Sequence, residues 1–244
     1  MKIPLISGHR GTRVHQIENT RAAFEFCLEH NFDYIEFDVK KTRDNKLIIF
    51  HDRYVNRLLS GKGKTENLTL SKLRKMAYKD GQKVQTLSEF FEQVGKQVIP
   101  MLEIKSRNIG KQVIDLVHKY GYEGREILIQ SFQGKDIEEC YKIDPQFDYG
   151  LCMAYLGKFP FFKKRIANFM YKRNIQPYPF VKWLNLDGPF IYDEFMGLLH
   201  KKDHKIILGA RNTEKYLPNI EKWHIDVINC DDGLKIRKLL KKMS

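Results

Sequence analysis

The sequence predicts an α/β protein, a (β/α)8 barrel that occupies residues 1–244 as one domain. Short apolar runs rich in β-branched residues recur along the chain, helical patterns lie between most of them, and no linker rich in Pro, Gly or Ser divides the sequence. Alternating strands and helices are typical of a parallel sheet covered by helices. A barrel of this class has about 250 residues, close to the 244 residues present.

Nine apolar runs are expected to form strands. They lie at 3–7, 34–39, 47–51, 98–104, 127–130, 149–153, 183–187, 206–209 and 227–230. The clearest helical patterns lie at 20–30, 88–94, 111–120 and 193–202, and a closing helix is expected in the tail from residue 235. If the third run only returns beside the second, eight parallel strands remain, the number that closes such a barrel.

The second and third runs are too close in the chain to be parallel neighbours. Seven residues separate them, whereas a parallel crossover needs about a dozen or more. We therefore expect an antiparallel return strand. With Asp44 and Asn45 as a two-residue turn, His51 lies opposite Asp38, on the face that also carries Glu36.

Composition excludes several classes of protein. The hydrophobic fraction of 42% and the charged fraction of 30% exclude a disordered or fibrous chain. The four cysteines form no CxxC pair, which argues against a zinc knuckle and a thioredoxin-like site. The amino-terminal stretch lacks the features of a secretory signal, and no apolar run is long enough to span a membrane. A cytoplasmic location is expected, with the cysteines as free thiols.

Positive charge is concentrated in two segments of the chain, whose formal net charge is +13. The segment 149–186, expected to be a crossover, has seven basic residues, no acidic residue and many aromatic rings, and the tail 232–244 has five basic residues and one acidic residue. Two interpretations of the crossover stay open: peripheral contact with an anionic membrane through residues 158–173, or ordinary packing on the barrel. A single-stranded nucleic-acid groove uses the same residue types, but no nucleic-acid partner is expected.

Residues suited to catalysis gather near the carboxyl ends of the first four expected strands. In a barrel these ends converge on one face, where active sites lie. The residues comprise two histidines, three carboxylates and two cations: His9, Arg10, Glu36, Asp38, His51, Glu103 and Lys105.

This set of side chains is suited to the cleavage of a phosphate ester. Three clustered carboxylates repel one another unless a cation is present, and an all-oxygen site favours one divalent metal ion, Mg²⁺ or Ca²⁺. His9 and His51 titrate near neutral pH, as acid–base catalysis requires. Arg10 and Lys105 supply fixed positive charge for a phosphate group.

The same fragments resemble the glycerophosphodiester phosphodiesterase family. The resemblance is dense over residues 5–105, and the segment 52–98 corresponds to the insertion typical of that family. The matching stretches are Gly-His-Arg-Gly at 8–11, Glu-Asn-Thr at 18–20, Glu-Phe-Asp-Val at 36–39, Thr-Arg-Asp at 42–44, His-Asp at 51–52, Gly-Lys-Gly at 61–63, Thr-Leu-Ser-Glu at 86–89 and Glu-Ile-Lys at 103–105.

The resemblance implies a TIM barrel that hydrolyses glycerophosphodiesters to glycerol 3-phosphate and an alcohol. It also implies site roles, namely a divalent metal on Glu36, Asp38 and Glu103, an acid–base pair His9 and His51, and phosphate contacts from Arg10 and Lys105. Two alternatives stay open: a lysophospholipase D that acts on lysophospholipids at a membrane surface, and a non-catalytic basic module that binds anionic lipid or nucleic acid.

The chain also departs from the family pattern. Gly-Ala-Arg-Asn at 209–212 stands where such enzymes usually carry Trp-Thr-Val-Asn, so that Gly209 replaces an aromatic residue of the substrate pocket. Cys230 replaces a threonine before Asp231, and Ile17 replaces a proline before Glu18. The departure at Gly209 is expected to affect substrate choice and to leave the metal chemistry intact.

Overall fold

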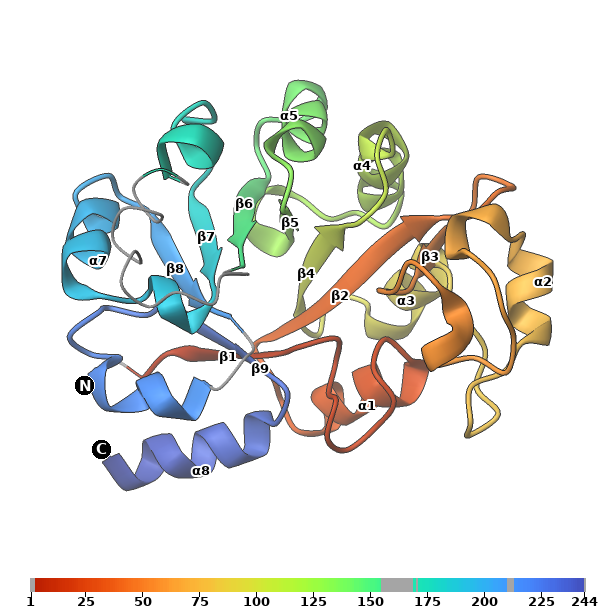
Figure 1. The fold of residues 1–244 in the computed structure, drawn as a ribbon, viewed down its shortest axis with the longest axis horizontal. Coiled ribbons are helices and arrows are strands. Elements are labelled where there is room, and N and C mark those ends of the chain that lie inside the picture. Colours follow the sequence, from red (N-terminus) through yellow and green to blue (C-terminus); the bar gives the residue numbers. More distant parts are fainter. Residues whose placement is uncertain (1–2, 155–168, 170, 210–212, 244) are drawn as a thin grey trace.

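The computed structural model describes residues 3–154, 169, 171–209 and 213–243 (Figure 1). The strands are β1 (Leu5–Gly8), β2 (Tyr34–Lys41), β3 (Leu47–Ile49), β4 (Ile99–Ile104), β5 (Leu128–Ser131), β6 (Asp148–Met153), β7 (Trp183–Leu186), β8 (Lys205–Leu208) and β9 (Val227–Cys230). The α-helices are α1 (Arg21–Glu29), α2 (Leu70–Lys75), α3 (Leu87–Val94), α4 (Gly110–Lys119), α5 (Gly134–Ile143), α7 (Asp193–His200) and α8 (Gly233–Met243).

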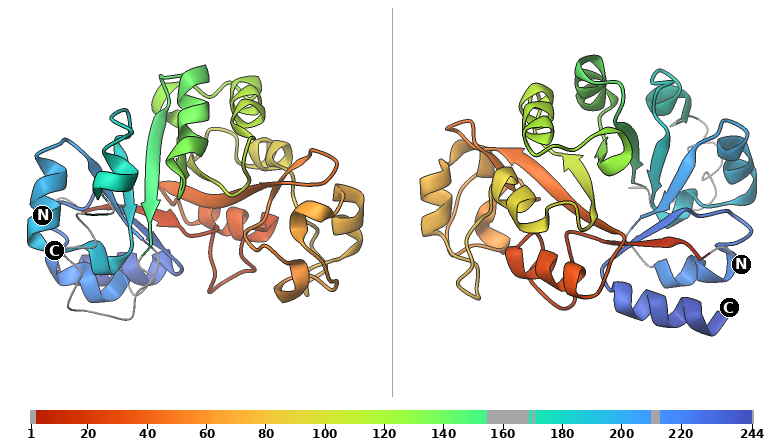
Figure 2. Two further views of the ribbon diagram at one scale, coloured as in Figure 1. Left: turned by 45° about the horizontal axis from the view of Figure 1, so that its top comes forward. Right: turned by 180° about the vertical axis from the view of Figure 1, so that it is seen from behind.

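Eight of these strands close into a parallel barrel. Their order is β1, β9, β8, β7, β6, β5, β4 and β2, and β2 pairs again with β1 to complete the ring. Helices surround the strands on the outside (Figure 2). β3 pairs antiparallel with β2 and lies outside the ring. The predicted barrel and its antiparallel return strand are therefore confirmed.

The predicted register of that return strand is wrong by one residue. Val39 pairs with Ile49, so the position opposite Asp38 is Phe50, whose backbone N–H donates to Asp38 O at 2.9 Å. The turn has three residues rather than two, because Asn45 adopts a left-handed conformation with φ of 57°. His51 lies beyond the end of β3 and beyond this last hydrogen bond to β2, so it reaches the barrel mouth from the loop and not through strand pairing.

The barrel interior has an apolar layer below a polar one. The apolar layer is a cluster made by Tyr34, Met101, Leu128, Trp183, Ile207 and Val227. Side chains alternate along a strand, so the residue two positions later on each strand faces the same interior. These residues are Glu36, Glu103, Gln130, Asn185, Gly209 and Asn229. The polar layer at the mouth therefore packs directly on an apolar layer of the barrel interior.

The segment 52–98 builds a small core of its own beside β3. Its buried members include Val55, Leu59, Leu73 and Tyr78, which pack with Phe50. The segment lies on the outer side of the barrel, beyond β3 (Figure 1), and returns to the ring through α3 and β4.

Two expectations from the sequence concern membranes. In the parts of the chain that the structure describes, no helix is long and apolar enough to cross a bilayer. The interpretation of residues 158–173 as a membrane contact, left open beside ordinary packing, falls largely on residues outside those described, since 155–168 and 170 are not among them.

Candidate active site

A tight turn after β1 directs His9 and Arg10 into the barrel mouth. Gly11 N–H donates to Gly8 O, and Gly11 has a φ of 79°, which favours glycine. A Cβ atom at Gly8 would lie 2.0 Å from Gly11 O, and a Cβ atom at Gly11 would lie 2.8 Å from Ala23 Cβ. Both glycines are therefore required for the turn that presents the two functional side chains.

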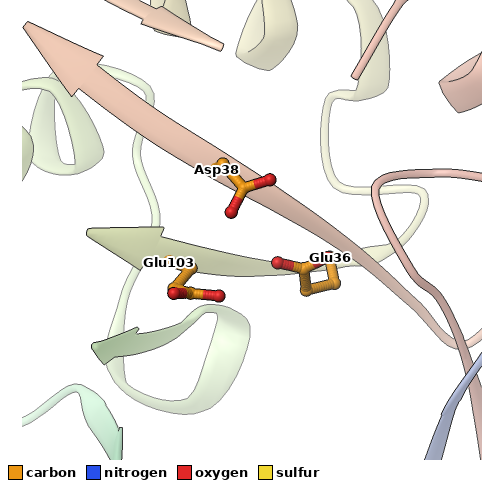
Figure 3. A group of neighbouring side chains, drawn as sticks. All are labelled: Glu36, Asp38 and Glu103. Carbon is orange, nitrogen blue, oxygen red and sulfur yellow. The ribbon is translucent and has the colours of Figure 1, made fainter. Parts of the chain in front are cut away.

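Three carboxylates meet at the mouth (Figure 3). Glu36 and Asp38 lie on β2, and Glu103 lies on β4 directly beside Asp38 in the parallel register. One oxygen atom from each lies within 4.8 Å of the others, and all three residues are buried. Burial, followed by the charges of the neighbouring carboxylates, raises the pKa of Glu36 well above its usual value.

Nearby cations compensate part of this negative charge. Lys105 Nζ lies 3.3 Å from Asp38 Oδ1 and contacts Glu103, while Arg10 Nε lies 3.3 Å from Asp38 Oδ2. Burial alone would raise the pKa of Asp38, but Lys105 and Arg10 lower it to about 2. The pKa of Glu103 is raised to about 7, because burial outweighs the effect of Lys105.

The cluster fits a hard divalent cation. Among the described residues, the charged nitrogen atoms within 4 Å of these carboxylates, apart from the imidazole of His9, belong to Arg10 and Lys105. When all three carboxylates are ionised, their negative charge therefore exceeds the positive charge of these two cations by one. Two of their oxygens, Asp38 Oδ1 and Glu103 Oε1, accept no hydrogen bond of regular geometry from the described residues. Oxygen donors with excess negative charge are the ligands that Mg²⁺ and Ca²⁺ prefer.

Each histidine is oriented by a carboxylate. His9 Nδ1 lies 2.6 Å from Asp231 Oδ1, and His51 Nδ1 lies 2.7 Å from Asp52 Oδ1. An ionised carboxylate can only accept a hydrogen bond, so the proton is assigned to Nδ1 and Nε2 is left for chemistry. Burial lowers the pKa of both histidines, which favours neutral imidazoles near pH 7.

The structure brings all seven predicted site residues together, and six of them line one pocket of about 460 Å³. The seventh, Asp38, is fully buried. Arg13, Asp52 and Arg57 also line this pocket. Its opposite wall comes from later strands and the loops after them, and comprises Phe132, Cys152, Met153, Ala154, Asn185, Asp187, Gly209 and Asn229.

Gly209 has no side chain and contributes only backbone atoms to this wall. A Cβ atom there would lie 3.0 Å from Leu186 O and 3.2 Å from Asn185 Oδ1. Asn229, on the adjacent strand β9, is buried, and its Oδ1 has no hydrogen-bond partner among the described residues. This side of the pocket therefore offers amide groups to a ligand. The remainder of the 209–212 motif lies outside the described residues.

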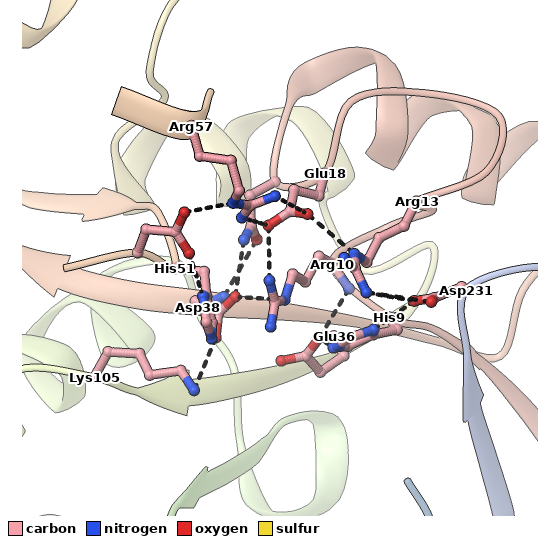
Figure 4. A network of polar contacts seen from close by, with 12 residues as sticks. His9, Arg10, Arg13, Glu18, Glu36, Asp38, His51, Arg57, Lys105 and Asp231 are labelled. Atoms are coloured by element: carbon pink, nitrogen blue, oxygen red, sulfur yellow. Dashed lines mark hydrogen bonds and ion pairs between the residues drawn. The ribbon is translucent and has the colours of Figure 1, made fainter. Parts of the chain in front are cut away.

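Sequence reasoning missed several charged residues around the site, among them Arg13 and Arg57 of the pocket lining. Asp231 and Asp52 orient the histidines, and Glu18 accepts hydrogen bonds from three arginines (Figure 4). Lys40 is buried on the same face of β2 as Asp38, and burial lowers its pKa. Strand alternation could have placed Lys40 on this face. The partner of His9, by contrast, lies 222 residues away in the sequence.

Comparison with known proteins identifies a consistent set of relatives. The model of the glycerophosphoryl diester phosphodiesterase family matches residues 9–155. The chain is 34% identical to a glycerophosphodiester phosphodiesterase of Caldanaerobacter subterraneus, over 60% of this chain and 65% of that protein. It is 26% identical to a glycerophosphodiester phosphodiesterase of Bacillus altitudinis, over 97% of this chain and 99% of that protein.

Solved structures share the fold. A glycerophosphodiester phosphodiesterase from Thermotoga maritima is 25% identical, with a TM-score of 0.78 over 98% of this chain and 99% of that one. A phosphodiesterase from Oleispira antarctica, solved in complex with the product sn-glycerol-3-phosphate, is 17% identical, with a TM-score of 0.81 over 98% of this chain and 97% of that one.

Proposed function

Because the chain belongs to the glycerophosphoryl diester phosphodiesterase family and is a phosphoric diester hydrolase, we propose that it hydrolyses glycerophosphodiesters to glycerol 3-phosphate and an alcohol. The observation that carries this proposal is one pocket lined by two histidines, two cations and the carboxylates Glu36 and Glu103, with the carboxylate of Asp38 buried beside them. The Oleispira relative, which binds sn-glycerol-3-phosphate as its product, supports the same assignment.

Glu36, Asp38 and Glu103 are proposed to hold one divalent cation, Mg²⁺ or Ca²⁺. When bound, such a cation polarises a phosphoryl oxygen and stabilises the charge that develops on it. The excess of carboxylate charge over the fixed cations Arg10 and Lys105 supports this role.

The chain's own residues are proposed to bind the phosphate and to move the protons. Arg10 and Lys105 bind the phosphate oxygens as fixed cations. One of the two histidines, neutral and unprotonated at Nε2, accepts a proton there from the attacking oxygen. The other acts in its imidazolium form, with a proton on both ring nitrogens, and donates the proton on Nε2 to the oxygen of the leaving alcohol. Asp231 and Asp52 hold the rings so that both Nε2 atoms are available.

The amide-bearing wall favours a small alcohol rich in hydroxyl groups. Asn185 and Asn229 line the pocket, and Asn229 Oδ1, which has no partner among the residues that the structure describes, can accept a hydrogen bond from a hydroxyl. A lysophospholipid is the second candidate substrate, because Phe132, Met153 and Ala154 give the same pocket an apolar side.

The proposal is tested by the release of glycerol 3-phosphate from glycerophosphocholine by purified protein. EDTA, Mg²⁺ and Ca²⁺ are compared, with lysophosphatidylcholine as a parallel substrate. A matched control is His118→Ala, which removes a histidine that pairs with Asp144 at 2.8 Å on the outer surface.

Metal-dependent release of glycerol 3-phosphate that survives in His118→Ala and is lost in His51→Ala supports the proposal. Turnover of the lysophospholipid alone would replace it with the second candidate. Absence of turnover and of metal binding would instead favour a non-catalytic module.

A further inference from the structure

Glu18 lies at the centre of an arginine cluster beside the proposed site (Figure 4). Its carboxylate is buried in the loop between β1 and α1 and is only 5% exposed. Arg10 Nη1 donates to Oε1 at 2.7 Å, and Arg13 Nε donates to Oε2 at 3.0 Å. Arg57 binds both oxygens, with Nη2 at 2.6 Å from Oε1 and Nη1 at 3.0 Å from Oε2.

Two of these arginines also donate hydrogen bonds to the carboxylates that orient the histidines. Arg13 Nη1 donates to Asp231 Oδ2 at 3.2 Å, and Asp231 accepts from His9. Arg57 Nε donates to Asp52 Oδ2 at 2.6 Å, and Asp52 accepts from His51. Glu18 is thus the shared member of two chains of hydrogen bonds, one to each histidine.

The charges of the cluster make this arrangement depend on Glu18. Three guanidinium groups converge on its carboxylate, and without that negative charge they would repel one another. Burial alone would raise the pKa of Glu18, but hydrogen bonds from Arg57 and Arg10 hold it well below its usual value. The carboxylate is therefore ionised over the whole neutral range.

The cluster also connects two parts of the fold. Arg57 belongs to the segment 52–98 outside the barrel, whereas Arg13 follows the turn after β1. Asp231 directly follows β9. Glu18 therefore joins the insertion and the closing strands of the barrel at one point.

We propose that Glu18 is a positioning residue that sets the orientation of both His9 and His51 through Arg13–Asp231 and Arg57–Asp52. Glu18 does not line the pocket, so it acts through its neighbours rather than on the reacting atoms. This inference rests on the proposed roles of the two histidines in phosphodiester hydrolysis.

Three variants separate the two branches of the network, Arg13–Asp231–His9 and Arg57–Asp52–His51. Arg13 and Arg57 are 36% and 45% exposed as side chains, so Arg13→Met and Arg57→Met leave no large buried cavity. Arg57→Met cuts the branch to His51, Arg13→Met cuts the branch to His9, and Glu18→Gln acts on both. The matched control is Glu89→Gln. Glu89 accepts hydrogen bonds from Arg74 Nη2 at 2.7 Å and 2.6 Å, and this pair does not line the pocket of the proposed site.

The first readout is the ¹⁵N NMR signals of the histidine rings in the protein of residues 1–244 with Mg²⁺, assigned from His9→Ala and His51→Ala. Wild type is expected to show Nδ1–H and unprotonated Nε2 for both rings. Glu18→Gln is expected to shift both rings toward a tautomer mixture, Arg57→Met only the His51 ring, and Arg13→Met only the His9 ring.

The second readout is turnover of glycerophosphocholine. Glu18→Gln is expected to lower kcat by about 10- to 100-fold, the range typical when a residue that orients a functional side chain is removed, with a smaller change in KM. Glu89→Gln is expected to leave kcat and both rings unchanged.

The outcomes separate this inference from the proposed function. If wild type turns over glycerophosphocholine but Glu18→Gln keeps both ring signals and kcat, the positioning role is overturned. If wild type lacks turnover but the ring signals change branch by branch, the positioning role is supported and the proposed reaction is overturned. If Glu18→Gln does not fold, ring signals that stay unchanged in both arginine variants overturn the inference.

Discussion

Replacing Glu36 by glutamine tests whether the carboxylate cluster is built for a cation. The variant keeps the shape of the side chain and an oxygen that can accept the 2.8 Å hydrogen bond from Arg10 N–H. It removes one of three charges whose oxygens lie within 4.8 Å of one another. At that distance two unit charges repel by about 3.5 kcal/mol with an effective dielectric constant of about 20.

The metal-free variant is therefore expected to be more stable than wild type. Since the hydrogen bond and the nearby cations offset part of the repulsion, we expect a gain of about 1–3 kcal/mol in the free energy of unfolding. For a chain of this size each kcal/mol raises Tm by about 2–4 °C. Because the folded-state pKa of Glu36 is raised well above its usual value, metal-free wild type loses stability as pH rises above about 4.5 and through that pKa, so the gain is larger at neutral pH than at pH 4.

Bound metal acts in the opposite direction and favours wild type. At a concentration of about 100 times its Kd, Mg²⁺ or Ca²⁺ stabilises wild type by about 2.7 kcal/mol, which is about 5–10 °C in Tm. Glu36→Gln is expected to lose most of this shift.

Thermal melts in EDTA, Mg²⁺ and Ca²⁺ measure both effects. Glu138→Gln is the control, because Glu138 lies on the outer helix α5 and pairs with Lys142. A Glu36→Gln protein that melts lower than wild type in EDTA, together with a wild type insensitive to both ions, would refute the reasoning.

Three further predictions follow from the geometry of the site. His9→Ala and His51→Ala are each expected to lower kcat by at least about 100-fold while the metal-induced rise in Tm is retained; near-normal turnover in either variant would contradict the acid–base role. Gly11→Ala is expected to cost at least about 2 kcal/mol in urea unfolding, because φ is 79° and the new Cβ would lie 2.8 Å from Ala23 Cβ; an unchanged midpoint would argue against this turn. The pKa of Glu18 is held below its usual value, so its stabilising contribution is present above about pH 4.5 and is lost on acidification. The difference in the free energy of unfolding between wild type and Glu18→Gln is therefore expected to shrink from pH 6 to pH 3. A difference that grows over this range would contradict the ion-pair account.

The fold could be predicted from local patterns. Each of the nine strands is present within a few residues of the predicted run, because buried strands of a barrel are short apolar segments between helices. The hairpin register failed, because it depends on one backbone angle at Asn45 that the residue type permits but does not require. An error of one residue was enough to assign His51 to the wrong partner.

The candidate site could be predicted only in part. The seven predicted residues lie at strand ends, where the barrel brings them together, and their residue types indicate the chemistry. Asp231 and Glu18 were visible as part of short motifs, but nothing local to either motif reveals a hydrogen bond to His9 or to Arg57. Such contacts depend on how the ends of the chain and the insertion pack, which the sequence pattern does not specify.

The pairing of β1 with β9 has a consequence for protein synthesis. The ribosome makes all three clustered carboxylates by residue 103, but Asp231 follows 128 residues later, directly after β9. A product that ends before β9 therefore has every carboxylate of the cluster, yet its barrel cannot close and His9 has no orienting partner. Completion of translation through β9 thus marks the point at which the His9 half of the site can be assembled.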